Sequence, residues 1–287
     1  MTAYDPGGDA VDRIVDSIAE TATEVRDGLA SDRTAKVGTN PSGERQEAAD
    51  VRADELFEAA LLAHDELGTY ASEEREDLVD GGSGQYHVAL DPLDGSSNLR
   101  SNNAMGTVFG IYDAPLPAKG RDLVAAGFVL YGAITTMVVA RDDVVTDYLI
   151  EGETPEVLAD DITLPEDPDI YGFGGFVPDW PEDFTAFARE IEQELKLRYG
   201  GAMIADINQL LTYGGIFAYP GLKSNPDGKL RLQFEGNPIA FVFEAAGGAS
   251  SDGTQSMLDV EPDGFHQRCP LHVGNTDLIE RLESSLD

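Results

Sequence analysis

The stretch Asp91-Pro-Leu-Asp-Gly-Ser-Ser-Asn98 brings two carboxylates, a glycine and two hydroxyl side chains together within eight residues. Residues 85–90 before it alternate and include aromatic and β-branched types, which predicts a strand that ends here because Pro92 cannot donate to a β-ladder. The two aspartates would then offer oxygen ligands to a divalent cation, beside N–H and hydroxyl donors suited to a phosphate. An ordinary turn is the alternative, since Asp, Pro and Gly are common turn residues.

The charge of the chain restricts its partners. Its 287 residues include 54 Asp and Glu against 19 Lys and Arg, a formal net charge of -35. This charge repels nucleic acid and anionic membranes, so neither is an expected partner. Acidic residues run from Asp5 to Asp287, which favours a halophilic protein, because salt near 1 M shortens the Debye length to about 3 Å and screens self-repulsion. An acidic mesophilic protein is the alternative.

Cysteine content and apolar segments favour a cytoplasmic protein. The single cysteine, Cys269, excludes an intrachain disulfide and fits a reducing compartment. The first residues lack the basic and apolar regions of a signal peptide, so no export is expected. The most apolar window, 125–140, is interrupted at Tyr131-Gly132 and Thr135-Thr136 and therefore predicts two buried strands, not a membrane span.

Apolar periodicity divides the chain into two halves. In the first half it predicts helices near 10–29 and 48–67 and a largely antiparallel sheet with strands near 86–90, 107–112, 124–131, 134–140 and 145–149. In the second half it predicts strands near 170, 216–219 and 230–234 and helices over 182–195, 204–211 and 238–246, an α/β pattern. Residues 151–169 are acidic, hold three prolines and lack periodicity. We therefore expect an N-terminal domain over 1–155 and a C-terminal domain over 165–287, with a long surface loop as the alternative.

Two adjacent glutamates, Glu73 and Glu74, precede the quoted stretch and add two oxygen ligands if their loop meets the same sheet edge. Adjacent glutamates are more often solvated surface charge, which is the alternative. The four histidines are widely spaced and there is one cysteine, so the sequence disfavours a zinc site and favours Mg²⁺ or Mn²⁺.

Seven further motifs follow in order: Gly106-Thr-Val-Phe-Gly-Ile-Tyr112, Ala126-Gly-Phe-Val-Leu-Tyr-Gly132, Arg198-Tyr-Gly-Gly-Ala-Met203, Tyr213-Gly-Gly-Ile-Phe-Ala-Tyr-Pro220, Gly228-Lys-Leu-Arg-Leu232, Glu235-Gly-Asn-Pro238 and Phe265-His-Gln-Arg268. With the quoted stretch, they resemble the class I fructose-1,6-bisphosphatases of the inositol monophosphatase superfamily. The resemblance extends from about Gly43 to Arg268, and several ordered matches are far more specific than one motif. It implies an α/β fold of alternating α/β/α/β/α layers and hydrolysis of the 1-phosphate of fructose 1,6-bisphosphate.

The resemblance also implies roles for residues at matching positions. The implied ligands of two or more metal ions are Glu73, Asp91, the carbonyl of Leu93, Asp94 and Glu235, with Glu74 beside the reacting water. The 1-phosphate would bind at Asp94, Gly95, Ser96 and Ser97. The sugar and its 6-phosphate would contact Arg198, Tyr199, Tyr219, Lys229 and Arg231. Arg198 would reach across from a neighbouring subunit, so a homo-oligomer, a dimer or a tetramer, is expected.

Local positive charge supports a second phosphate. A phosphate monoester carries about two negative charges near neutral pH, which this acidic chain must offset with metals and nearby cations. Lys223, Lys229 and Arg231 fall within nine positions although the whole chain has 19 basic residues. The alternative is a basic hairpin edge around a turn at 225–228.

Two more acids, Asp50 and Glu44, align with the family's catalytic loop, and Glu44 stands where many relatives have Asp. Either is a candidate to help Glu74 take a proton from the attacking water, and Asp50 is preferred. The alternative is that both are favoured as acids near a helix amino terminus.

The stretch Tyr171-Gly-Phe-Gly-Gly-Phe-Val177 departs from the family, which has Asn and Tyr contacts to the 6-phosphate there. This leaves open a broader specificity that includes inositol 1-phosphate or sedoheptulose 1,7-bisphosphate. A sugar-phosphate-binding protein without catalysis is a further alternative. No match to the nucleotide inhibitor site of animal enzymes is found, so AMP regulation is not supported.

Overall fold

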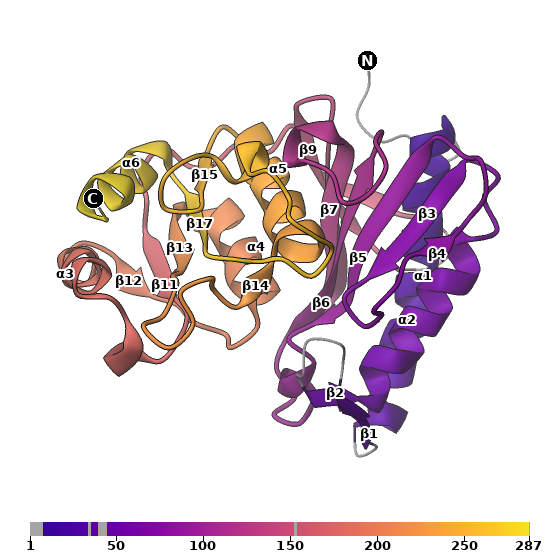
Figure 1. The fold of residues 1–287 in the computed structure, drawn as a ribbon, viewed down its shortest axis with the longest axis horizontal. Helices are drawn as coiled ribbons and strands as arrows, with labels where there is room; N and C mark the ends of the chain where they lie inside the picture. Colours follow the sequence, from indigo (N-terminus) through magenta and orange to yellow (C-terminus); the bar gives the residue numbers. More distant parts are fainter. Residues whose placement is uncertain (1–7, 34–35, 40–44, 152–153, 287) are drawn as a thin grey trace.

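Helices and sheets alternate in five layers along the molecule (Figure 1). The computed structural model describes residues 8–33, 36–39, 45–151 and 154–286. The outer helical layers hold α1 (Ala10–Asp32) with α2 (Ala48–Leu61), and α3 (Glu182–Ile191) with α6 (Thr276–Ser285). Helices α4 (Met203–Tyr213) and α5 (Asn237–Ala245) lie between the two main sheets. The predicted α/β fold with alternating layers is confirmed, and no described helix is long and apolar enough to cross a membrane.

The first sheet has the strand order β10-β9-β8-β7-β6-β5-β3-β4. It is antiparallel apart from the parallel β3 and β5 pair, as the sequence predicts for most of it. Its strands are β3 (Leu67–Ser72), β4 (Val79–Asp80), β5 (Tyr86–Asp94), β6 (Met105–Tyr112), β7 (Leu123–Tyr131), β8 (Thr135–Arg141), β9 (Val144–Leu149) and β10 (Glu156–Ala159). A separate ribbon pairs β1 (Lys36–Thr39) with β2 (Arg45–Glu47).

Two predicted boundaries in this half are wrong. The helix predicted to reach residue 67 ends at Leu61, because Leu67 is fully buried as the first residue of β3, which the prediction omitted. The strand before the quoted stretch does not end at Pro92 but continues to Asp94. Its pairing with β6 shifts register between Asp91 and Asp94, so the proline lies where the ladder is already irregular.

The second sheet has the order β12-β11-β13-β17-β15. Its strands are β11 (Ile170–Phe173), β12 (Lys196–Leu197), β13 (Gly215–Tyr219), β15 (Ala249–Ser251) and β17 (Leu271–Gly274). A short pair joins β14 (Leu230–Arg231) to β16 (Arg268–Cys269). The strand predicted over 230–234 is wrong beyond Arg231, since residues Leu232–Gly236 form a π-helical turn that leads into α5.

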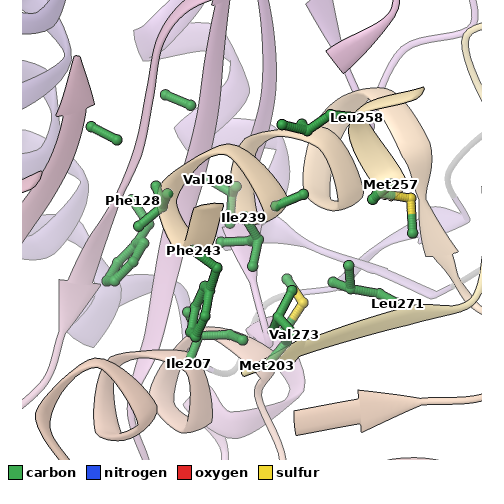
Figure 2. Close-up of a cluster of buried hydrophobic side chains, with 14 of the residues drawn as sticks. Val108, Phe128, Met203, Ile207, Ile239, Phe243, Met257, Leu258, Leu271 and Val273 are labelled. Atoms are coloured by element: carbon green, nitrogen blue, oxygen red, sulfur yellow. The ribbon is translucent and has the colours of Figure 1, made fainter. Parts of the chain in front are cut away.

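Apolar side chains between the two sheets form a continuous core (Figure 2). Ile207 of α4 and Phe243 of α5 pack between Phe128 of the first sheet and Val273 of the second, and all four are almost fully buried. The chain passes from one sheet to the other between Ala159 and Ile170. The division into domains 1–155 and 165–287 stays a prediction.

Candidate active site

A cavity of about 220 Å³ is lined by residues of β5 in the first sheet, of β13 in the second sheet and of the start of α4. Most residues that the sequence predicts for the site line it: Asp50, Glu73, Glu74, Asp91, Leu93, Asp94, Gly95, Ser96, Ser97, Tyr199, Tyr219, Lys229 and Glu235. The prediction omitted other wall residues, namely Gly201, Ala202, Met203, Phe217 and Leu230. Three of these, Gly201, Ala202 and Met203, belong to the motif Arg198–Met203. The motif therefore pointed to this part of the wall, but these three residues have no polar or charged side chain that would have marked them as site residues.

Three carboxylates gather at one end of the cavity. Oxygen atoms of Glu73, Asp91 and Glu235 all lie within 4.8 Å of one another, although the residues come from the end of β3, from β5 and from the π-helical turn. Burial raises the pKa of Asp91 well above its usual range, and the neighbouring acids raise it further. Burial and the charges of Glu73 and Asp94 likewise raise the pKa of Glu235. Buried oxygens of like charge at this spacing fit a hard divalent cation, which would offset their repulsion.

Backbone contacts hold these carboxylates in place. The amide of Glu73 donates to the Leu90 carbonyl at 3.1 Å, which ties the end of β3 to β5. One oxygen of Asp91 accepts from the Leu93 amide at 2.9 Å, and one of Glu235 accepts from the Arg231 amide at 2.7 Å. The positions of the three carboxylates therefore depend on the strand irregularity and the π-helical turn, two features that the sequence patterns did not predict.

Asp94 connects the cluster to the first turn of α4. Its Oδ2 accepts from the backbone amide of Ile204 at 2.8 Å. Burial raises the pKa of Asp94 to about 6, against the lowering effects of that hydrogen bond and of Lys229. A carboxylate at the amino terminus of a helix is favoured by the helix dipole.

The residues after Asp94 form a tight loop suited to an anion. Gly95 has a left-handed φ of 74° and starts a 3-10 helix over Ser96–Leu99. A Cβ at Gly95 would lie 2.2 Å from Cβ of Ala202, so only glycine fits this close approach. Gly95, Ser96 and Ser97 all line the cavity, where their N–H and hydroxyl groups are the donors that a phosphate requires.

Asp50 lies on the cavity wall and also at the start of α2. Its Oδ2 accepts from the Glu47 amide at 2.6 Å as part of a capping box, so the predicted alternative of a helix amino-terminal acid is confirmed. Burial raises the pKa of Asp50 to about 6, although the Glu47 amide and the Ser96 hydroxyl lower it. The second candidate on this loop, Glu44, lies outside the described residues.

Lys229 and two tyrosines, Tyr199 and Tyr219, also line the cavity. The Lys229 ammonium lies 5.9 Å from the centre of the Tyr219 ring, and Tyr199 is half exposed. Among the described residues, none of 171–177 lines the cavity. A Cβ at Gly174 would lie 2.3 Å from the Tyr219 ring, so the close packing of that ring excludes a larger residue at this position.

The two arginines predicted to contact the distal phosphate do not line the cavity. Arg231 is completely buried, its Nη1 donates to the Lys229 carbonyl at 2.7 Å, and its Nη2 lies 3.8 Å from Glu73. The predicted contact of Arg231 with the distal phosphate stays a prediction, and in this structure the Arg231 guanidinium lies beside the carboxylate cluster. Arg198 is exposed and donates to the Leu197 carbonyl at 3.1 Å, and its role at the site of a neighbouring subunit stays a prediction.

Comparison with known proteins covers both halves of the chain. A family model described as the N-terminal domain of fructose-1,6-bisphosphatase matches residues 18–158, and one described as the C-terminal domain matches residues 164–287. A solved structure of Leishmania major fructose-1,6-bisphosphatase in holo form is similar with a TM-score of 0.91 at 26% identity, covering 96% of this chain and 94% of that one.

Relatives named class 1 fructose-1,6-bisphosphatase occur in halophilic archaea. The protein of Natronomonas pharaonis is 60% identical over 280 residues, which cover 97% of this chain and 99% of the relative. That of Halobacterium salinarum is 56% identical, covering 97% and 98%. With both halves matched and this identity over nearly the whole length, the chain belongs to the class 1 fructose-1,6-bisphosphatase family.

Proposed function

We propose that this protein hydrolyses the 1-phosphate of fructose 1,6-bisphosphate to yield fructose 6-phosphate and phosphate. The observation that carries this proposal is one cavity lined both by a cluster of buried carboxylates and by a lysine with two tyrosines. A substrate with two phosphates matches this combination, since one phosphate can contact cations held by the carboxylates and the other can pair with the lysine. Relatives with this name at up to 60% identity support the proposal.

The carboxylate end would hold two or more Mg²⁺ or Mn²⁺ ions. Their ligands would be Glu73, Asp91, Asp94, Glu235 and the Leu93 carbonyl, and bound ions would neutralise phosphate oxygens and lower the pKa of the attacking water. The loop Gly95–Ser97 orients the 1-phosphate through its N–H and hydroxyl donors. Glu74, with Asp50 and Glu44 as further candidates, accepts the proton of the attacking water.

The lysine end would bind the sugar and the 6-phosphate. Lys229 pairs with the phosphate, and the hydroxyls of Tyr199 and Tyr219 orient the sugar. Arg198 would come from a neighbouring subunit in a dimer or tetramer. The exposure of Arg198 supports this. Three apolar side chains, Phe176, Val177 and Leu197, are also 71%, 57% and 59% exposed in a single subunit, and exposed apolar surface of this kind is typical of a contact with another subunit. The protein would act in the cytoplasm of a halophile.

Phosphate release tests the proposal directly. We expect turnover of fructose 1,6-bisphosphate in high salt with Mg²⁺, and none after chelation. Sedoheptulose 1,7-bisphosphate, inositol 1-phosphate and glycerol 2-phosphate serve as comparison substrates. No turnover of any of them would contradict an enzymatic function and favour a binding protein.

Relaxed specificity is a second candidate function. The absence of residues 171–177 from the cavity wall favours it, because this segment then adds no contact to the distal phosphate. Equal kcat/KM on monophosphates and bisphosphates would support it and would exclude a distal phosphate site at Lys229.

A further inference from the structure

The backbone amide and the backbone carbonyl of Gly200 both form hydrogen bonds with side chains. Gly200 directly follows Tyr199, which lines the cavity. The Gly200 amide donates to Oδ1 of Asp206 at 2.7 Å. The Gly200 carbonyl accepts from Nδ2 of Asn98 at 3.1 Å. One residue earlier, the Arg198 amide donates to the Tyr171 carbonyl at 2.8 Å. The segment that carries Tyr199 is thus tied at both of its ends.

Asn98 is the last residue of the stretch that contains the phosphate-binding loop. Its backbone amide donates to the Gly95 carbonyl at 2.8 Å and closes that loop, while its Nδ2 also donates to the Ala104 carbonyl at 2.9 Å. The side chain is 8% exposed. Its Oδ1 faces the next residue of the other segment, since a Cβ at Gly201 would lie 3.3 Å away. One side chain therefore spans from the loop to the Tyr199 segment.

Asp206 holds the same segment from the opposite side. It lies on α4, is 1% exposed, and its second oxygen, Oδ2, has no hydrogen-bond partner. Burial raises the pKa of Asp206 to about 7. A buried carboxyl oxygen without a hydrogen-bond partner is unfavourable for folding. Its presence indicates that Asp206 is kept for a role other than stability, and its one hydrogen bond, to the Gly200 amide, points to that role.

The two contacts join two segments of the cavity wall, the loop at 95–97 and the segment that carries Tyr199. The loop at 95–97 belongs to the end that would bind the 1-phosphate, and Tyr199 belongs to the end that would bind the 6-phosphate. We propose that Asn98 and Asp206 are positioning residues which set the distance between the two phosphate-binding ends by fixing Gly200 between them. Neither side chain touches substrate in this proposal, which rests on the proposed function.

Substitution of Asn98 tests the proposal through a difference between two ligands. The variant Asn98→Ala keeps the loop amide but loses both side-chain hydrogen bonds. We expect its KM for fructose 1,6-bisphosphate to rise about tenfold, as for the loss of one or two buried hydrogen bonds. The inhibition constant of orthophosphate, which requires only the loop end, should stay within about twofold. Asn103→Ala is the matched control, because its side chain is exposed on the same loop.

Two variants of Asp206 supply the second arm. Asp206→Asn keeps an acceptor for the Gly200 amide and should retain the wild-type KM, whereas Asp206→Ala should raise it as Asn98→Ala does. Thermal unfolding shows whether each variant folds, and an unfolded Asp206→Ala leaves Asn98→Ala to decide. Equal weakening of orthophosphate and bisphosphate, or an unchanged KM in Asn98→Ala, would overturn the proposal. A wild-type protein without turnover would instead contradict the proposed function.

Discussion

Asp91 shows how strongly its surroundings favour a bound cation. It is buried among Glu73, Glu235, Asp94 and Glu74, and both burial and these charges raise its pKa. Such a cluster of buried carboxylates lowers the stability of the folded state. A cation that binds only the folded state would offset this loss. The carboxylates are therefore better explained by function than by stability.

Asp94→Asn tests the metal cage at one position. We expect kcat to fall by at least about 100-fold, because a metal ligand is lost while the amide oxygen can still accept from Ile204. The melting temperature without metal should not decrease, since one member of a repelling group is neutralised. Steady-state kinetics and thermal unfolding measure the two effects, with the exposed Asp65→Asn as control. Activity within threefold of wild type would mean that Asp94 is not a ligand.

The raised pKa of Asp94, about 6, predicts how stabilisation by Mg²⁺ depends on pH. The folded state holds this proton at higher pH than the unfolded chain, so without metal its contribution to stability falls as pH rises from about 4 to 6. Metal binding requires the carboxylates to be deprotonated. Saturating Mg²⁺ should thus raise the melting temperature more at pH 8 than at pH 5.5. A shift that is larger at pH 5.5 would contradict this.

Arg231 is predicted from the sequence to contact the distal phosphate, whereas in the structure it lies beside the carboxylate cluster. Its buried guanidinium lies beside Glu73, so Arg231→Gln should weaken Mg²⁺ activation about tenfold through a disturbed carboxylate cluster. The binding of fructose 6-phosphate, which carries the distal phosphate, should change less than threefold. Titrations of activity with Mg²⁺ and of inhibition with fructose 6-phosphate distinguish the two roles. The opposite pattern would restore the predicted contact to the distal phosphate.

At the scale of elements, the loop after β5 depends on backbone geometry at Gly95. Gly95→Ala would require a left-handed φ and place Cβ against Ala202, so we expect a loss of about 2 kcal/mol or more in unfolding free energy, with reduced activity. Gly82→Ala is a sharp control, since Gly82 also has a positive φ but nothing lies within 4 Å of its Cβ position. Denaturant unfolding measures both variants. Equal losses would show that the contact with Ala202 does not matter.

Four helices, α1, α3, α4 and α5, were predicted within a few residues of their observed bounds, whereas α6 was not predicted although it has an apolar face. Asp9 caps the start of α1, where its side chain accepts from the amides of Val11 and Asp12. The first three residues of the π-helical turn, 232–234, were predicted as part of a strand, because apolar and polar residues alternate over 230–234 as in a strand. That turn brings Glu235 to the carboxylates of Glu73 and Asp91.

At the scale of the whole molecule, Arg198 predicts that subunits share their sites. Suppose that Arg198 acts in the site of a neighbouring subunit. A hybrid dimer of one Arg198→Ala subunit and one Asp94→Asn subunit then contains one intact site, with Asp94 from the first subunit and Arg198 from the second. We expect mixed and refolded subunits to recover about a quarter or more of wild-type activity, whereas each variant alone stays nearly inactive. Activity after mixing measures this, with unmixed refolded variants as controls. No recovery in a confirmed hybrid would place Arg198 in its own subunit's site or outside any site.

The sequence by itself determined the family, the layered α/β class and most of the cavity wall. Asp91, Asp94 and Glu73 could be recognised from short sequence motifs. The net charge of -35 agrees with the occurrence of similar proteins in halophilic archaea. Only the tertiary structure decided that a π-helical turn carries Glu235 to Glu73 and Asp91, that Arg231 faces the carboxylates, and that Asn98 and Asp206 hold Gly200 between them. These contacts join residues far apart in the chain or depend on irregular backbone, and neither leaves a periodic pattern in the sequence.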